Sequence, residues 1–442
     1  MTSLRARLLT ALAAVVFAGG VLAEDATPPP LTLGQAIETV LKRYPTIDAA
    51  QAAVDASRAR STQASAALLP QVSGQGGYTY NSLRPYVAFT FPGIGTTALY
   101  ESIQNSYNAS VSVRQLLTDF GRTDALVKLA RTGELTARDA LDATRHQLGY
   151  ETIQAFYGVL LLRQSVSVAD EEIQSLEEAR RIADRKFAAG SATKFDVLTT
   201  GVRQANARNR RTDIVNALEK QEALLRQLLG RGLGSPLPLE GDFDPSRETP
   251  DVSTAIAEGL KNRPEMKIAI DGETGAHLQL EAASREARPT IAAQAAAGVD
   301  DGNLPSMYDN RGYVVGGVTL SVPLFTGRRI SGERQEARAG IRSAQARINE
   351  LNGTIGTDVT DAISDWSAAR ARLTNADALV DQAAEALALA RTRYGNGVIT
   401  NFELLDAQSA ARSAELTRLQ ARYDCVLASQ AVSRAAGRAP QP

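Results

Sequence analysis

The chain has 442 residues with 48 basic and 49 acidic side chains, so its formal net charge is −1. This balance offers no basic footprint for nucleic acid, and we expect no nucleic-acid partner. Hydrophobic residues make up 44% of the chain, as in folded proteins, but aromatic residues make up only 5%, which argues against a large aromatic core.

The N-terminal segment, residues 1–23, has the features of a secretory signal peptide. Arg5 and Arg7 precede the apolar run LLTALAAVVFAGGVLA. Val21 and Ala23 then fit the small-residue rule for cleavage. The alternative is a short membrane anchor, but the run is short and rich in alanine. The sequence therefore predicts an exported protein.

Cysteine and histidine are too few for a disulfide framework or a metal cluster. Cys425 is the only cysteine, and it lies too far from the predicted cleavage site for lipid attachment at a mature N-terminus. His146 and His277 lie alone in the sequence, so we expect no metal and no cofactor. No run of about 18 apolar residues follows the signal segment, so any part that enters a membrane must enter it as strands.

The sequence repeats itself in two halves. LGQAIETVLKRYPTIDAAQ from Leu33 resembles DVSTAIAEGLKNRPEMKIA from Asp251, and QLLTDFGR resembles VPLFTGRR. FAAGSATKFDVLTTG from Phe187 resembles YGNGVITNFELLDAQ from Tyr394, 207 residues later. Because these landmarks keep the same order, the sequence predicts an internal duplication.

The predicted layout follows from the repeats and from a segment dense in proline and glycine between them. Each repeat consists of a helix, a strand pair and a long helical hairpin. The predicted ranges are 24–230 for the first repeat (strands about 71–117, hairpin about 121–230), 231–250 for a linker or equatorial segment, 251–437 for the second repeat (strands about 290–324, hairpin about 327–437) and 438–442 for a tail.

Two long stretches lack proline and favour helix. No proline occurs between Pro92 and Pro236 or between Pro323 and Pro440, and both stretches are rich in Ala, Leu, Arg, Glu and Gln. Apolar residues recur there at three- and four-residue steps, as in coiled coils. A helix of about 68 residues would be about 100 Å long and must project as a hairpin or bundle.

Glycines supply the expected turns of these hairpins. Gly190 and Gly397 suit the left-handed conformation that commonly ends a helix. Ser191 or Thr193 in the first hairpin, and Thr400 in the second, are available to cap the returning helix.

Four segments alternate as strands do, two in each repeat. In NASVSVRQLL, Ala109, Val111 and Val113 lie opposite polar residues, and YVVGGVTLSVPLF from Tyr313 alternates similarly. The first connecting segment, about 81–103, is read as a long aromatic loop. Residues near the loop-side strand ends suit an interface girdle, and they are Tyr78, Tyr80, Tyr107 and Tyr313.

Alternating strands of this kind are typical of a membrane barrel, although an ordinary half-buried hairpin is the alternative for each pair. Four strands cannot close a barrel, and open edges are untenable in lipid. The sequence therefore predicts that several subunits share one barrel, with twelve strands in a trimer. The expected fold class is mainly α with a small β part.

The order of these motifs resembles the TolC family of outer-membrane efflux and type I secretion channels. QLLTDFGR, SVPLFTGRR, FAAGSATKFDVL and YGNGVITNFELLDAQ carry the resemblance, which covers nearly the whole mature chain. It implies a homotrimer with a β-barrel in the outer membrane, a long α-helical coiled-coil barrel across the periplasm, and an equatorial collar that includes residues 231–250 and the C-terminal tail.

The resemblance also implies a function. Such proteins are passive exit ducts of tripartite machines, opened by a periplasmic adaptor (membrane fusion) protein and an inner-membrane transporter of the ABC or RND type. Outer-membrane lipid would surround the strands. The cargo stays open among drugs, metal ions, polysaccharide and protein. The alternatives are a periplasmic coiled-coil adaptor, which should have one hairpin between compact β domains, and an exported coiled-coil scaffold.

Three acids after the turns are candidate gate residues. By resemblance, Glu403 and Asp406 match positions at the narrow periplasmic entrance, and Asp196 matches an acid of the gate network. Glu403 and Asp406 are three residues apart and share a helix face. Threefold symmetry would repeat each acid into a ring that favours cations and raises some carboxylate pKa values. The alternative is solvated surface acids.

Tyr394 either hydrogen-bonds across neighbouring hairpins and holds the entrance shut or forms a hydrophobic staple for the turn. The turns themselves are the expected adaptor-docking surface, in the helix-in-groove mode, unless they only reverse the chain. These docking residues are Ala189, Gly190, Ser191, Asn396, Gly397 and Val398.

The sequence departs from the family pattern at two places. Some relatives have a basic gate residue where this chain has Ile399, so Arg391 or Arg393 is a candidate replacement. The lipidated cysteine of several multidrug-efflux relatives is also absent, which favours the secretion-type members. No third group supports an acid–base pair of Glu403 and Asp406, so we expect no enzyme activity.

Overall fold

The structure is a computed structural model that describes residues 30–80, 82, 86–101, 105–243, 251–300 and 311–440. The predicted signal peptide lies outside the described residues, as do residues 244–250 of the predicted linker, the strand connection 301–310 and residues 441–442 of the tail.

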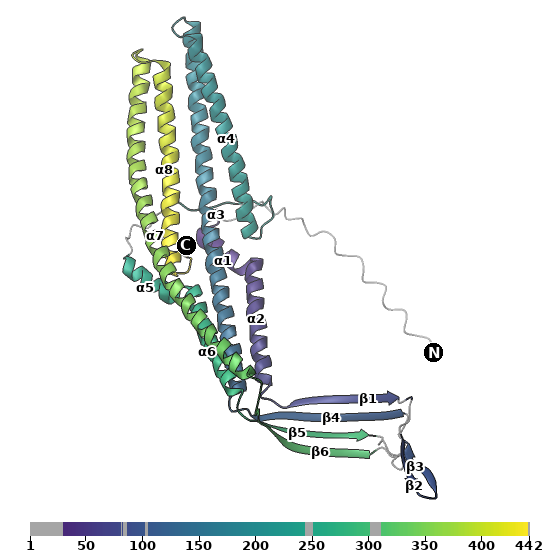
Figure 1. The fold of residues 1–442 in the computed structure, drawn as a ribbon. Coiled ribbons are helices and arrows are strands. Elements are labelled where there is room, and N and C mark those ends of the chain that lie inside the picture. The colour runs from purple at the N-terminus through teal and green to yellow at the C-terminus, as the bar shows by residue number, and fades with distance from the viewer. Residues whose placement is uncertain are drawn as a thin grey trace, which may run out of the picture.

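Two long helical hairpins lie side by side at one end of the molecule, and a β-sheet lies at the other (Figure 1). In chain order the described elements are α1 (Leu33–Arg43), α2 (Pro45–Ala66), β1 (Gln71–Tyr80), β2 (Tyr86–Phe91), β3 (Gly95–Glu101), β4 (Asn105–Thr118), α3 (Arg122–Ala188), α4 (Lys194–Leu228), α5 (Val252–Asn262), α6 (Pro264–Arg285), β5 (Thr290–Asp300), β6 (Arg311–Ser321), α7 (Arg329–Gly395) and α8 (Asn401–Ala435).

The helices occur in two matching sets. α1 and α5 each have 11 residues, α2 and α6 each have 22, α3 and α7 each have 67, and α4 and α8 each have 35. Equivalent helices start 219 residues apart before the strands (33 and 252) and 207 residues apart after them (122 and 329). The difference arises in the connection between the two strands, which is longer in the first half.

A proline divides the helical segment that precedes each strand pair, where the sequence predicted a single helix. Pro45 and Pro264 each occupy the first turn of a helix, where the missing N–H leaves no hydrogen bond unmade. The residues before them, Tyr44 and Arg263, are extended, with ψ of 128° in both cases. Each segment is therefore a short helix followed by a longer one.

The main core lies midway along the first hairpin, where α1 and the segment after α4 wrap around α3. Phe156 and Ile153 of α3 are each 1% exposed and pack with Leu225 of α4. Leu237 and Phe243, from the predicted linker, are buried in the same cluster. A second core joins α5, α6, α7 and α8 around Trp366. The linker segment as far as residue 243 is thus packed onto the helices at mid-height.

β1, β4, β5 and β6 form one antiparallel sheet in the order β1-β4-β5-β6, so the two repeats contribute adjacent strand pairs. The predicted strands are confirmed, with β1 and β6 at the two edges. The segment 81–103, predicted as a loop, contains a further hairpin of β2 and β3. Its turn uses Gly93 and Gly95, with φ of 89° and 92°.

The strand register places most polar side chains on one face and most apolar side chains on the other, with Leu116 and Val315 on the polar face as exceptions. Ser73 of β1 lies opposite Ser112 of β4, and their hydroxyl oxygens are 2.9 Å apart. The polar face carries Gln71, Ser73, Gln75, Asn108, Ser110, Ser112, Arg114 and Gln294, and the apolar face carries Val72, Tyr78, Tyr80, Tyr107, Val111, Val113, Ile291, Val299, Val314, Val318 and Leu320.

The tyrosines follow this division with one exception. Tyr78 and Tyr107 lie opposite each other on the apolar face, with ring centroids 5.1 Å apart. Tyr80 shares that face, whereas the register places Tyr313 on the polar face, beside Gly298. The prediction that Tyr313 joins an interface girdle is wrong, because Tyr313 is next to Val314 of the apolar face and so points to the other side of the sheet.

Side chains of the second repeat form hydrogen bonds with the junction between β4 and α3 in the first repeat. Asp119 accepts hydrogen bonds from the backbone N–H groups of Gly121 and Thr123, at 3.1 and 2.7 Å, and so caps α3. Arg285 donates to the Gly121 carbonyl at 2.7 Å, and Arg288 donates to the Phe120 carbonyl at 3.1 Å. The sheet is therefore anchored to both helical halves.

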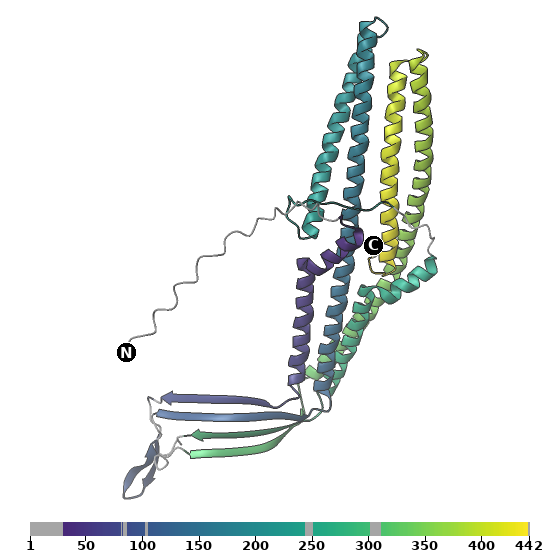
Figure 2. The ribbon, with the colours of Figure 1, turned by 180° about the vertical axis from the view of Figure 1, so that it is seen from behind.

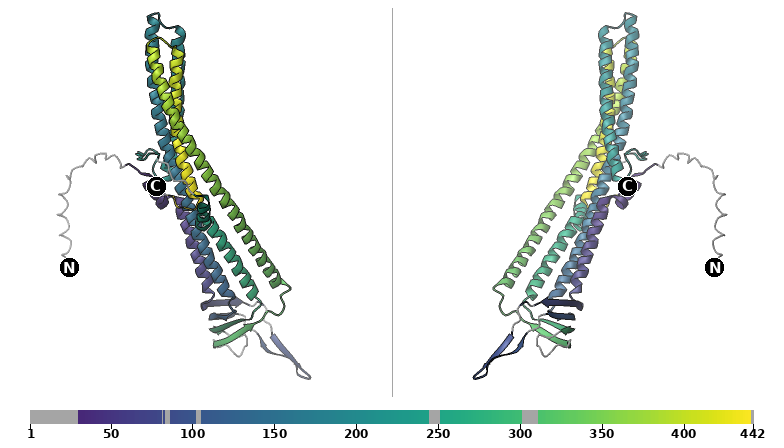
Figure 3. Two further views of the ribbon diagram at one scale, coloured as in Figure 1. Left: turned by 90° about the vertical axis from the view of Figure 1, so that its left-hand side faces the viewer. Right: turned by 90° about the vertical axis from the view of Figure 1, so that its right-hand side faces the viewer.

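The turned views show an elongated helical body with the sheet projecting to one side at one end (Figures 2 and 3). Figure 3 shows α7 bending between its sheet end and its tip. Among the described helices, none is both long and apolar enough to cross a membrane.

Candidate functional site at the hairpin tips

The four predicted gate residues and the six predicted docking residues all lie at the end of the molecule that is farthest from the sheet. Ala189, Gly190 and Ser191 form the turn between α3 and α4, and Asn396, Gly397 and Val398 form the turn between α7 and α8. Tyr394 is in the last turn of α7. Asp196 and Glu403 are in the first turns of α4 and α8, and Asp406 is in the second turn of α8. Figure 2 shows the two turns next to each other.

The two turns have the same hydrogen-bond pattern. Ser191 N–H donates to the Lys186 carbonyl at 2.8 Å, and Val398 N–H donates to the Arg393 carbonyl at 2.9 Å. Gly190 and Gly397 have φ of 71° and 75°. This is the Schellman arrangement, in which the residue after the helix is left-handed. The prediction that both glycines form the hairpin turns is confirmed.

Threonine caps the returning helix in both hairpins. Thr193 and Thr400 accept hydrogen bonds from the N–H groups of Asp196 and Glu403, at 3.2 and 3.3 Å. The two carboxylates accept in return from the threonine N–H groups, at 2.9 and 2.7 Å. Each turn is thus followed by a complete capping box. Ser191, the other candidate cap, instead donates to the Lys186 carbonyl at 3.1 Å.

The capping boxes give two of the predicted gate acids a local structural role. Hydrogen bonds from the Thr400 backbone N–H and hydroxyl hold the pKa of Glu403 below its ordinary value. In the single chain this shift is opposite to the rise expected for a ring of like charges. Asp406 lies exposed one helical turn further along α8, and no hydrogen bond or ion pair engages it among the described residues.

Tyr394 makes two kinds of contact at the tip. The Lys186 ammonium lies 3.8 Å from the centroid of its ring, a cation–π contact between the two hairpins. Tyr394 also packs against the buried cluster that contains Leu387 and Leu404. Ile399 packs against that cluster from the position before the cap, so that it and Leu404 form a hydrophobic staple.

The packing of Ile399 concerns the basic gate residue that the resemblance predicts at this position and that the chain lacks. At that position, Ile399 contributes apolar packing. Among the described contacts, neither Arg391 nor Arg393 forms a salt bridge, although Arg391 lines the groove next to Tyr394. Neither arginine therefore takes over the missing contact within the single chain.

A polar contact between the hairpins, missed by the sequence analysis, lies just below the tips. Asn401 of α8 donates through Nδ2 to Oγ1 of Thr200 of α4 at 3.1 Å, and both side chains are buried. Arg203 donates to the Leu405 carbonyl at 3.0 Å. Its guanidinium lies 5.4 Å from the centroid of the Phe402 ring. We call Thr200, Arg203, Asn401 and Leu405 the inter-hairpin contact.

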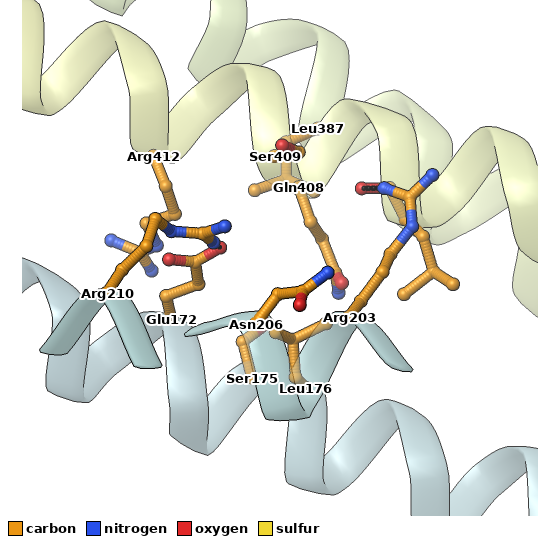
Figure 4. Close-up of a pocket in the computed structure, with 11 residues that line it drawn as sticks. Glu172, Ser175, Leu176, Arg203, Asn206, Arg210, Leu387, Gln408, Ser409 and Arg412 are labelled. Atoms are coloured by element: carbon orange, nitrogen blue, oxygen red, sulfur yellow. Dashed lines mark hydrogen bonds and ion pairs between the residues drawn. The ribbon is translucent and has the colours of Figure 1, made fainter. Parts of the chain in front are cut away.

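A second polar link lies about two helical turns further from the tips. Arg412 donates to Glu171 of α3 at 2.8 Å and to Glu415 of its own helix at 2.7 Å. The hollow between the two links is lined by charged and amide side chains from both hairpins (Figure 4). Arg210 of α4 and Glu172 of α3 form an ion pair at 2.5 Å within the first hairpin, on one wall of the hollow. The Gln408 Oε1 atom is buried there without a hydrogen-bond partner.

The chemistry of this region is that of a contact surface. No group of three metal-ligating side chains occurs among the residues that the structure describes. Around the hollow, arginines are paired with carboxylates or backbone carbonyls. The arrangement can hold two hairpins together and release them, since most of its contacts are polar and partly solvated.

Comparison with known proteins agrees with this architecture. The family model described as "Outer membrane efflux protein" matches residues 36–231 and 255–438, one match to each half of the chain. The chain belongs to this family, and it is an outer-membrane efflux channel by fold and by relationship. The prediction from the sequence motifs is confirmed.

Curated relatives have names from both secretion and efflux. The alkaline protease secretion protein AprF of Pseudomonas aeruginosa is 24% identical over 88% of this chain and 80% of its own length. The outer membrane efflux protein BepC of Brucella suis is 25% identical over 96% of this chain and 89% of its own length. These relatives are named as transport proteins, not as enzymes.

Solved structures share the fold. The outer membrane protein VceC of Vibrio cholerae has a TM-score of 0.76 and 19% identity, over 92% of this chain and 97% of that one. CusC, described by its conformational changes on folding and transmembrane channel formation, has a TM-score of 0.77 and 17% identity, over 92% of each chain. The fold class predicted from the sequence, mainly α with a small β part, is therefore confirmed.

Proposed function

We propose that three copies of the chain form one passive duct from the periplasm to the cell exterior. The observation that carries this proposal is the two-faced sheet with free edges at the end of a long helical rod. β1 and β6 each have one unpaired edge among the described strands. Pairing β6 of one copy with β1 of the next satisfies these backbone groups and gives twelve strands around a lumen.

The distribution of side chains supports this arrangement. Outward apolar residues such as Val314, Val318 and Leu320 are 84%, 67% and 62% exposed in the single chain. An exposed apolar surface of this size suits contact with lipid hydrocarbon. The serine, glutamine and asparagine side chains of the other face suit a water-filled lumen. Outer-membrane lipid and two further copies are thus the partners nearest to the sheet.

At the other end, we propose that the hairpin tips form the periplasmic entrance. Asp196, Tyr394, Glu403 and Asp406 form its gate, and the inter-hairpin contact holds it closed. The turns, with Gly190 and Gly397 at their centres, form the docking surface for a periplasmic adaptor. Their matching backbone geometry supports this, because two equivalent turns present the same shape twice in each copy.

The energy for transport then comes from an inner-membrane transporter of the ABC or RND type, and the duct performs no chemical step. One curated relative is named for protease secretion and another for efflux. The chain therefore joins a tripartite efflux or secretion system, and its fold does not specify the cargo. A periplasmic adaptor is a poorer description, because the structure has two hairpins and a strand sheet with a continuous apolar face.

Conductance in planar lipid bilayers tests this proposal. Purified mature protein is added to one chamber, and discrete current steps of uniform size are expected after insertion. Boiled protein provides the control, since it lacks the native assembly. Membranes that stay silent over a range of protein concentrations would contradict the proposal.

A further inference from the structure

The strand register places three charged residues on the polar face of the sheet: Arg114 at the helix end of the strands, and Asp300 and Arg311 opposite each other at the far end. Among the strand residues whose side chains the structure describes, Arg114 of β4 is the one with a charge. The register places it between Gln71 of β1 and Gln294 of β5, on the face of Ser73 and Ser112. It therefore lies on the side opposite the apolar surface.

The surroundings of Arg114 suit a free guanidinium. The residue is exposed, and no hydrogen bond or ion pair to it occurs among the described contacts. It lines a hollow at the base of the sheet, where the end of α2 meets the strands, together with Gln63 and Gln71. Amide side chains and an arginine without a carboxylate partner can donate hydrogen bonds to an anion.

We propose that Arg114 of each copy forms a basic ring in the lumen, at the helix end of the strands, that binds and concentrates anionic groups of passing solutes. This inference rests on the proposed trimeric duct. Its ligands are carboxylate, phosphate or sulfate groups, which match the planar fork of arginine donors. The ring gives the duct a second selective position, opposite in sign to the acids at the tips.

The charge of the ring and the salt concentration determine how strongly Arg114 changes ion selectivity. Three positive charges around a water-filled lumen raise the local concentration of anions and lower that of cations. Salt screens the ring, because the Debye length falls from about 10 Å at 0.1 M to about 3 Å at 1 M. The contribution of Arg114 to ion selectivity is therefore large at low salt and small at high salt.

Reversal potentials in planar bilayers under a KCl gradient test the proposal. We expect Arg114→Gln to lower the ratio of chloride to potassium permeability by about twofold or more near 0.1 M KCl, and by much less near 1 M. Arg114→Glu should lower it further. Arg114→Lys keeps the charge and should keep the wild-type ratio. Ser112→Gln, on the same face and without a charge change, is the matched control.

The outcomes separate this inference from the proposed function. If wild-type protein forms no channels, the duct itself is contradicted. If all variants form channels of normal size and Arg114→Gln keeps the wild-type permeability ratio at 0.1 M KCl, the duct stands and the basic ring is wrong. An effect of Ser112→Gln equal to that of Arg114→Gln would also overturn the ring, because a local distortion would then explain both.

Discussion

At the scale of single residues, the capping boxes give two of the proposed gate acids a structural role as well. Glu403 completes the cap of α8 through Thr400, and Asp196 does the same for α4 through Thr193. A carboxylate held in this way has a fixed position near the tip. Asp406 has no such constraint within the described residues and is free to face the entrance.

Neutralising the acids on α8 should change ion selectivity. With Glu403→Gln and Asp406→Asn combined, we expect the preference for cations to fall by about twofold or more, because two rings of three carboxylates are lost. Glutamine keeps an oxygen acceptor for the cap, so the helix start should survive. Reversal potentials in bilayers measure the effect. Unchanged selectivity would remove both residues from the entrance.

The inter-hairpin contact should hold the entrance closed. Asn401→Ala removes the amide that donates to the buried Thr200 hydroxyl, which keeps its own bond to the Asp196 carbonyl, and Arg203→Ala removes a charged donor from the Leu405 carbonyl. Each change costs about 1–3 kcal/mol in the closed arrangement. We therefore expect the double variant to raise the open fraction of single channels by about tenfold or more.

Single-channel recording of this double variant needs a control on the same helix. Lys220→Ala serves, because Lys220 is an exposed residue of α4 far from the tips. Wild-type gating in the double variant would show that the contact does not restrain the hairpins.

At the scale of the elements, the proline pattern and the strand alternation predicted most of the architecture. The proline-free stretches became helices of 67 and 35 residues in each half. Alternation along β4 and β6 gave the correct faces, because strand side chains have a period of two. Pro45 broke a predicted helix into two, which its restriction on Tyr44 explains.

Other elements could not be predicted from the sequence. β2 and β3 form a local hairpin in a segment rich in aromatic residues and glycine, where a loop and a strand pair have similar composition. Asn401 and Thr200 meet only because α4 and α8 lie side by side at one particular register. A single sequence carries no signal for the register between separate coiled-coil hairpins, so this part of the site was missed.

The turn glycines allow a matched test of tip stability. Gly397→Ala puts a Cβ at φ of 75°, which costs about 1–2 kcal/mol. Gly395→Ala lies in the last turn of α7, where alanine is favoured over glycine by about 0.8–1.0 kcal/mol. Hydrogen exchange at residues 393–400 should therefore be about fivefold or more faster in Gly397→Ala and slower in Gly395→Ala. Equal rates in both variants would contradict the role of the left-handed turn.

At the scale of the whole molecule, three regions follow one another: the sheet, the tightly packed middle of the helices, and the two hairpin tips. The large buried clusters lie around Phe156 and Trp366, at mid-height, and only small clusters occur near the tips. The middle therefore has the larger buried core, whereas near the tips the hairpins are joined by polar contacts and by the small apolar cluster of Leu176, Ala207 and Leu405. This distribution suits a duct that opens at one end while its membrane end stays closed to lipid.

The central claim is that the four-stranded sheet of one chain forms a closed barrel only together with the sheets of other copies. The number of copies in the purified protein tests this claim most directly. Native mass spectrometry of the mature protein released from detergent micelles should show three copies, and removal of detergent should cause precipitation, since the apolar face of the sheet would meet water. A monomer that stays soluble without detergent or lipid would contradict the account.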